Sequence, residues 1–198
     1  MEWAKLRGIQ QGLVLMFCAC SLAVAAGPAG LWLDVPFVKQ EKDGCGAASI
    51  AMVMQYWQRQ QNKTPNDESD ARKIQQSLYS KQAHGIYASD AETYLRQHGF
   101  RTFAFQGTWD DLRQHLAKGR PLIVALKIVA LKPGSGNAPL HYVVAAGLDQ
   151  EPELVLVNDP ATRKLLKEGR SDFEREWKGA GNWTLLAIPN EDAPSVAP

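Results

Sequence analysis

The chain is short of cysteine, of net charge and of long apolar segments, and each shortage excludes a class of protein. It has three cysteines among 198 residues and a formal net charge of +1. Without a basic excess, the sequence offers no patch for nucleic acid. No internal repeat and no linker divide it, so its length favours one globular domain with its own core.

The longest apolar run lies at the N-terminus and has the features of a secretory signal peptide. Lys5 and Arg7 precede a stretch of small and apolar residues that ends in the cleavage pattern Ala23-Val24-Ala25. A membrane anchor needs about 18 or more apolar residues, and this run is shorter. We therefore expect residues 1–25 to be a signal peptide and the protein to be periplasmic or secreted, with no stable membrane insertion after cleavage.

Cleavage would leave Cys45 as the only cysteine. Cys18 and Cys20 leave with the signal peptide, so neither an intramolecular disulfide nor a Cys-rich metal site remains available. A lipoprotein anchored at Cys20 is the less favoured alternative, because Phe17 stands where such signals usually carry leucine. A lone thiol in an exported protein is either buried and inert or kept for its reactivity.

Cys45 stands at the start of a strong helical pattern. Polar and glycine-rich residues precede it, and the apolar residues that follow recur at helical spacing: Ile50, Val53, Met54 and Trp57. This spacing predicts a helix from Cys45 to about Gln58 with one buried face. At a helix N-terminus, unpaired N–H groups and the macrodipole favour a negative charge, which makes a thiol there reactive. We interpret Cys45 as a catalytic nucleophile.

Helical patterns fill the first half of the chain and strand patterns the second, which predicts an α+β fold. Further helices are expected at 70–80, from a Ser89–Glu92 capping box to Gly99, from a Thr108–Asp111 box to about Lys118, and from a Ser171–Glu174 box through Trp177. Strands are expected at 101–105, 121–129, 140–148, 154–158 and 183–189, after an extended lead-in at 31–38. The domain should span 31–190, with a flexible loop at 132–139, a polar loop at 60–70 and a flexible tail at 191–198.

A thiol nucleophile needs a base, and His141 is the candidate among four histidines. His84 lies in a loop, His98 precedes the Gly99 helix end and His115 lies on a charged helix face, so structural or solvated roles fit these three. His141 follows a glycine-rich loop at the start of an apolar strand, where rigid backbone would hold its imidazole. The alternative is a histidine that merely caps the strand.

Asp159 and Gln40 complete the predicted site. If the strands 140–148 and 154–158 pair antiparallel through the turn between them, His141 lies close to Asp159, which could fix the imidazole tautomer. Asp159 could instead be an ordinary turn residue before a proline. Gln40 lies just upstream of Cys45, where a side-chain amide and the Cys45 N–H could hold an oxyanion.

These residues sit in strings that resemble the C39-type, bacteriocin-processing cysteine peptidases of the papain-like clan. The resemblance is carried by V-P-F-V-K-Q-E-K-D-G-C-G-A-A-S-I-A-M-V, L-H-Y-V-V-A-A-G and V-N-D-P, in that order, and covers roughly residues 35–188. It implies a papain-like fold in which an N-terminal helical part carries the Cys helix and packs on a C-terminal antiparallel sheet carrying His and Asp. It further implies Cys45 as nucleophile, His141 as base, Asp159 as its orienter and Gln40 as the oxyanion-hole residue.

The expected function is hydrolysis of a peptide or amide bond, without metal or organic cofactor, on a peptide or protein substrate. In the transporters that process bacteriocins, this domain is fused to membrane helices and an ATPase, whereas this sequence shows a signal-peptide pattern. The specificity for double-glycine leaders is therefore not carried over. Two alternatives stay open: a domain that binds peptides in the same groove without turnover, and an acyl or amide transferase that uses the same thiol.

Overall fold

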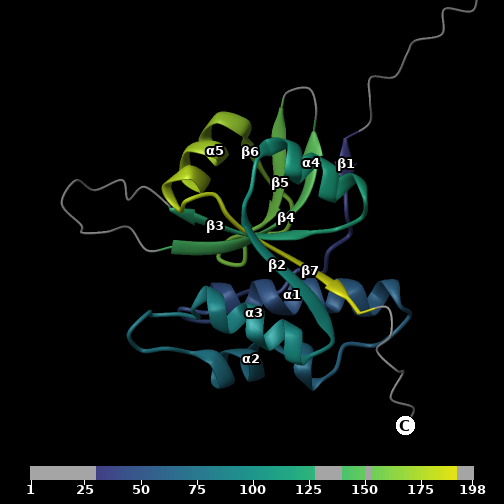
Figure 1. The fold of residues 1–198 in the computed structure, drawn as a ribbon, viewed down its shortest axis with the longest axis vertical. Helices are drawn as coiled ribbons and strands as arrows, with labels where there is room; N and C mark the ends of the chain where they lie inside the picture. Colours follow the sequence, from purple (N-terminus) through teal and green to yellow (C-terminus); the bar gives the residue numbers. More distant parts are fainter. Residues whose placement is uncertain (1–29, 128–139, 150–152, 191–198) are drawn as a thin grey trace, which may run out of the picture.

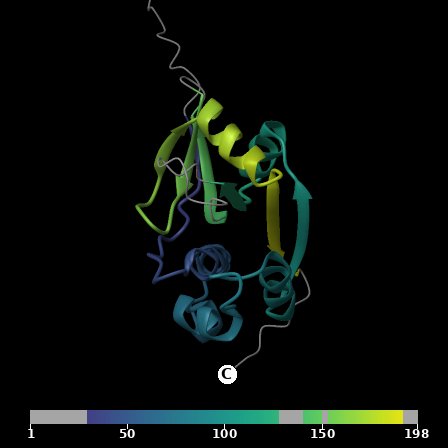
Figure 2. The same ribbon diagram turned by 90° about the vertical axis from the view of Figure 1, so that its left-hand side faces the viewer.

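A seven-stranded antiparallel sheet with helices on both faces organises the chain (Figures 1 and 2). The structure is a computed structural model and describes residues 30–127, 140–149 and 153–190. Its strands are β1 (Leu31–Trp32), β2 (Phe100–Gln106), β3 (Leu122–Lys127), β4 (Leu140–Asp149), β5 (Leu154–Asn158), β6 (Leu166–Gly169) and β7 (Trp183–Pro189). They pair in the order β2-β7-β3-β4-β5-β6, and β1 pairs with β4.

Helices α1, α2 and α3 lie below the sheet in Figure 1, and α4 and α5 lie above it. The lower elements are α1 (Cys45–Gln60), η1 (Asp67–Ser69), α2 (Ala71–Leu78) and α3 (Ala88–Gln97). The upper helices are α4 (Trp109–Ala117) and α5 (Arg170–Gly179). Within these described ranges, no helix has both the length and the hydrophobicity needed to cross a bilayer. The α+β class and the papain-like arrangement predicted from the sequence are confirmed.

The sheet separates two apolar cores. In β3, Ile123 and Ala125 belong to the core between the sheet and α1, whereas Leu122 and Val124 belong to the core between the sheet and helices α4 and α5. Successive residues of a strand point to opposite faces, so a strand covered on both faces must be apolar at every position. This explains why β3 and β4 have continuous apolar sequences instead of an alternating pattern.

Helix α1 is the central element of the lower layer. Its predicted span to about Gln58 is confirmed within two residues, because the helix ends at Gln60. The prediction that only one face of α1 is buried was too narrow, because Met52 and Tyr56 are buried as well. Helices α2, η1 and α3 cover the side of α1 that faces away from the sheet. The indole N–H of Trp57 donates to the Ala187 carbonyl (2.9 Å), which fixes α1 against β7.

Two of the three predicted capping boxes are wrong. Helix α3 begins at Ala88, so Ser89 lies inside its first turn and bonds Asp90 instead of capping. Helix α5 begins at Arg170 after Gly169, so Ser171 is already helical and Glu174 pairs with Arg170. In both cases the helix begins at the residue before the serine. The Thr108–Asp111 box is confirmed, with both of its reciprocal bonds present.

Several short elements differ from the sequence prediction. Strand β6 was missed because its sequence, L-K-E-G, has no apolar alternation, and η1 lies where only a loop was expected. The lead-in at 31–38 forms a strand only over Leu31–Trp32, where it pairs with β4. The signal peptide at 1–25, the loop at 132–139 and the tail at 191–198 lie outside the described residues, so these predictions stay predictions.

Gly107 provides a test of the core between the sheet and α5. A Cβ at this position would lie 2.5 Å from Cζ2 of Trp177 and 2.6 Å from Oγ1 of Thr184, and both neighbours are buried. We expect Gly107→Ala to lower the free energy of unfolding by about 1–3 kcal/mol through overpacking. Thermal unfolding of Gly169→Ala is the control, because a Cβ there meets no atom within 4 Å. Equal melting temperatures for both variants would contradict this packing.

Candidate active site

Cys45 is the first residue of α1, and its backbone environment favours a negative charge. The N-cap is Gly44, which offers no side chain to the first-turn N–H groups, and that turn contains no acidic residue. Asp43 precedes it with a φ of 56°, in the left-handed region that a short polar side chain tolerates. No capping or acidic side chain of that turn therefore competes with the Cys45 sulfur for the positive end of the helix dipole.

His141 and Asp159 meet at the same end of the sheet. The predicted antiparallel pairing of β4 with β5 is present, and Val144 lies opposite Asn158. This register brings Nε2 of His141 to 2.7 Å from Oδ1 of Asp159. Their side chains are 12% and 11% exposed, so water screens the pair little. The close approach of His141 to Asp159 that the strand pairing predicted is thus present.

The Asp159 carboxylate is held from three directions. Oδ1 also accepts from the Ala161 N–H at 2.9 Å, and Oδ2 accepts from the Thr162 hydroxyl at 2.9 Å. Burial raises the pKa of Asp159, but the bonds from His141 and from the turn outweigh it, so the carboxyl pKa lies below its usual value. Sequence reasoning missed Thr162, although an Asp followed by Thr at i+3 is a recognisable turn pattern.

Cys45 and His141 form a coupled pair. Burial raises the pKa of the Cys45 thiol, but the hydrogen bond with His141 and bonds from the backbone of Tyr142 and Gly46 outweigh it, so this pKa is lowered. Burial opposes protonation of His141, yet its bonds to Asp159 and Cys45 raise the imidazole pKa to about 9. Both directions favour a thiolate beside an imidazolium at neutral pH.

Tyr142 and Ile86 form the wall around the first turn of α1. A Cβ at Gly46 would lie 3.2 Å from Cβ of Ile86 and 3.4 Å from Cδ2 of Tyr142, so the helix start fits closely between them. Burial, followed by the nearby Cys45 charge, raises the pKa of Tyr142 to about 12. Tyr142 therefore stays neutral beside the thiol over the working pH range.

Glu168 is a further titratable group of the sheet that the sequence did not single out. It lies on β6, the neighbour of β5. Burial, followed by the charges of Glu176 and Asp159, raises the pKa of Glu168 to about 7. Glu168 is therefore expected to gain its charge near neutral pH.

Gln40 is attached to the turn that carries Asp159. Its backbone N–H donates to the Pro160 carbonyl at 3.0 Å. Asn158 makes a second link, since its side chain donates to the Val35 carbonyl at 3.1 Å and accepts from the Leu165 N–H at 2.9 Å. The segment before α1 is thus fixed to the end of β5, which sets Gln40 and Asp159 side by side along the backbone.

A cavity of about 410 Å³ borders the Gln40 segment and the first turns of α1. Its lining includes Gln40, Gly44, Ala48 and Gln55. Oε1 of Gln40 is buried, and within the described ranges it has no hydrogen-bond partner. The amide is therefore not committed to an internal bond in the part of the chain that the structure describes.

The other three histidines have the structural settings expected for them. Nδ1 of His98 lies 2.7 Å from the Tyr94 carbonyl, and the two rings stack at the end of α3. His115 packs against Phe105, and burial lowers the pKa of its imidazole. His84 is exposed in a turn with a φ of 49°.

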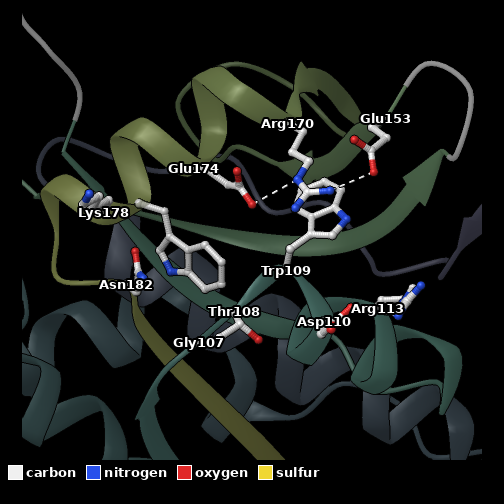
Figure 3. A pocket seen from close by; sticks show the side chains of 11 residues that line it. Gly107, Thr108, Trp109, Asp110, Arg113, Glu153, Arg170, Glu174, Lys178 and Asn182 are labelled. Atoms are coloured by element: carbon white, nitrogen blue, oxygen red, sulfur yellow. Dashed lines mark hydrogen bonds and ion pairs between the residues drawn. The ribbon is translucent and has the colours of Figure 1, made fainter.

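A larger cavity, of about 610 Å³, lies on the opposite side of the sheet between α4 and α5 (Figure 3). Three of its charged side chains are paired with one another: Arg170 bonds Glu153 at 2.8 Å and Glu174 at 3.0 Å, and the Arg170 guanidinium lies over the Trp109 ring. None of the four predicted site residues lines it. Size alone therefore does not make it part of the thiol site. Among the described residues, no cluster of three or more His, Cys, Asp or Glu side chains could hold a metal ion.

The fold and this site define the class of the protein as a cysteine-type peptidase of papain-like architecture. The family profile described as the Peptidase_C39 like family matches residues 32–185, and the chain belongs to that family. A comparison with curated protein sequences finds no match to the chain. The resemblance seen in the sequence is confirmed.

Solved structures share this fold at low sequence identity. A double glycine motif protease from an AMS/PCAT transporter, solved with the leader peptide, has 22% identity and a TM-score of 0.56; the match covers 80% of this chain and 94% of that one. A C39-like peptidase from Bacillus anthracis has 20% identity and a TM-score of 0.55, over 82% and 99% of the two chains. The peptidase domain of Streptococcus ComA has 20% identity and a TM-score of 0.56, over 79% and 99%.

Proposed function

We propose that the protein is an exported cysteine peptidase that hydrolyses peptide or amide bonds through Cys45, His141 and Asp159, with Gln40 in the oxyanion hole. The observation that carries the proposal is the position of His141 between two partners: its ring lies 2.7 Å from the Asp159 carboxylate and forms a hydrogen bond with Cys45. The structural relative solved with a leader peptide supports a peptide as the substrate class.

The first half of the reaction forms an acyl-enzyme. The Cys45 thiolate attacks the substrate carbonyl carbon, and the carbonyl oxygen becomes an oxyanion. His141, already protonated, gives its proton to the leaving amine as the C–N bond breaks. Asp159 keeps the imidazole in the tautomer and orientation that this transfer needs.

The second half releases the acyl group. Neutral His141 removes a proton from water, the resulting hydroxide attacks the thioester, and the C–S bond breaks to restore the thiolate and the imidazolium. Gln40 and the Cys45 N–H stabilise the oxyanion in both halves. Of the four site residues, only Gln40 lines the cavity beside α1 and α2, so that cavity is not assigned to the substrate. No metal or organic cofactor takes part in these steps.

Digestion of a mixed peptide library tests this function and does not require a named substrate. We expect the wild type to cleave members of the library, as read by mass spectrometry, and Cys45→Ala to leave them intact. Cys45→Ala is a small change at a partly buried position, so matched thermal unfolding curves serve as the folding control. Cleavage at the same bonds by both proteins would contradict the assignment. Binding of a library peptide by wild type without any cleavage would favour the non-hydrolytic alternative.

The same acyl-enzyme could serve an acyl transferase, and the products separate the two reactions. Hydrolysis in ¹⁸O-labelled water places one label in each new carboxyl group, whereas transfer to an added amine gives an unlabelled amide. We expect labelled acids to remain the main product when free amines are present at millimolar concentration. Amide products in excess over acids would assign the chain to the transferases.

Export rests on the N-terminal pattern and is tested separately. N-terminal sequencing of the protein recovered from outside the cytoplasm should find a start near Ala26. A protein that keeps Met1, or one whose mature chain begins at Cys20, would contradict cleavage by the expected route.

A further inference from the structure

The strand order β2-β7-β3-β4-β5-β6 ends in two edge strands, and β2 is the longer of them. Strand β2 has seven residues and pairs only with β7, and Figure 2 shows it at the rim of the molecule. Strand β6, at the other edge, has four residues, among them Lys167 and Glu168. Short length and charged side chains commonly protect an edge strand from pairing with another chain. Strand β2 is longer than β6 and has fewer charged residues. Arg101 is its only charged residue.

Two backbone hydrogen bonds determine which groups of β2 face outward. The Gly107 N–H donates to the Asn182 carbonyl, and the Asn190 N–H donates to the Gly99 carbonyl, both at 2.9 Å. Bonded and non-bonded pairs alternate along an antiparallel ladder. The odd-numbered residues therefore bond β7, and the N–H and C=O groups of the even-numbered residues point away from it: Phe100, Thr102, Ala104 and Gln106. Within the described ranges, no loop or helix backbone bonds the outward groups of Thr102 and Ala104.

The side chains along this edge alternate as well. Phe100 packs into the core beneath α1, whereas Phe105 packs against the core beneath α4. Arg101, Phe103 and Phe105 therefore share one face, and Phe103 is 49% exposed. An exposed aromatic in the middle of an unpaired edge is a feature that strand addition would cover.

We propose that a second copy of this chain pairs with β2 antiparallel, across a twofold axis that passes at Phe103. This is the register in which all seven residues of β2 pair, since Phe100 then lies opposite Gln106. It places the outward groups of Thr102 opposite those of Ala104, so that both strands satisfy each other's hydrogen bonds. A twofold interface of this kind uses the same surface on both copies.

The side chains fit this register. Phe103 stacks on its counterpart at the axis, and Arg101 lies opposite Phe105, where a guanidinium over an aromatic ring is favourable. A register shifted toward the N-terminus of β2 would place Arg101 opposite itself, which like charges disfavour. Cys45 lies on α1, which contacts mainly α2, β4 and η1, so the pairing leaves the thiol site open.

Disulfide trapping tests the register directly. The test uses the full chain with Cys18, Cys20 and Cys45 changed to serine, into which Phe103→Cys or Arg101→Cys is introduced. Residues opposite each other in a non-hydrogen-bonded pair have Cα atoms about 4.5 Å apart, within the range of a disulfide. Two copies of residue 101 would lie four residues apart along the strand, about 13 Å. We expect mild oxidation to give a covalent dimer with Phe103→Cys and little with Arg101→Cys.

Light scattering of the unmodified chain between about 5 and 200 μM provides the second readout. We expect a dimer that Ala104→Pro weakens at least tenfold, because proline removes an outward N–H. Proline is tolerated on an edge strand, so the variant should keep its melting temperature and its Cys45 alkylation rate. A monomer over the whole range, equal trapping by both cysteine variants, or a dimer unaffected by Ala104→Pro would overturn the proposal.

Discussion

Changing His141 to alanine should slow alkylation of Cys45 by iodoacetamide at pH 6 by roughly 100-fold. An isolated thiol has a pKa of about 8.5, so only about 0.3% of it is ionised at pH 6. In the wild type, the bond with His141 and the imidazolium charge keep Cys45 below its usual pKa, so a larger fraction is thiolate. The greater intrinsic nucleophilicity of a high-pKa thiolate offsets part of the loss, which is why the expected factor stays below the ionisation ratio.

His98→Ala is the matched control for this experiment. His98 is also a partly buried histidine. Its ring lies against the Tyr94 carbonyl at the end of α3, and it has no bond to the thiol. We expect the alkylation rate of His98→Ala to equal that of the wild type, with both variants folded by circular dichroism. Equal rates for His141→Ala and wild type would remove His141 from the base role and leave Cys45 as an ordinary cysteine.

The second large effect concerns Gln40. If its amide holds the oxyanion, Gln40→Ala should lower kcat by about 10²–10³-fold on any peptide that the wild type cleaves, because one donor to the transition state is lost. The Cys45 alkylation rate should stay within about twofold of wild type, since no oxyanion forms in that reaction. This separation of turnover from thiol reactivity distinguishes an oxyanion donor from a residue that activates the thiol.

Gln55→Ala is the control on the same cavity. Gln55 also lines the space beside α1, and its amide donates to the Ser69 carbonyl at 2.9 Å, away from Cys45. It should change KM more than kcat, if it changes either. A Gln40→Ala variant with unchanged kcat would show that Gln40 only anchors its segment through the backbone bond to Pro160.

The geometry of the candidate site was predictable because it depends on two strong local signals. Helical spacing after Cys45 placed the thiol at a helix start, and the short turn between two apolar strands placed His141 beside Asp159. The resemblance to C39-type peptidases added Gln40 and the order of the parts. The structure confirms the helix start and the contact between His141 and Asp159, while the roles of all four residues stay proposals.

The remaining features depend on tertiary packing that a local pattern does not contain. Met52 and Tyr56 are buried because α2 and α3 cover α1 from outside the sheet. Ser89 and Ser171 were assigned as caps because serine is a good cap, yet the N-caps are Tyr87 and Gly169, two residues earlier. Strand β6 forms because β5 offers its edge, although the L-K-E-G sequence has little strand propensity of its own.

The central claim, that His141 keeps Cys45 as a thiolate, is tested most directly by a pH titration of the thiol. Thiolate absorbance is followed from pH 3 to 10 in the wild type, with Cys45→Ser subtracted. Cys45 gains its charge as pH rises through its lowered pKa, and the ion pair persists until His141 loses its proton near about pH 9. We predict a midpoint well below about 8.5, with a further change near 9. A single midpoint at about 8.5 or above would contradict the claim.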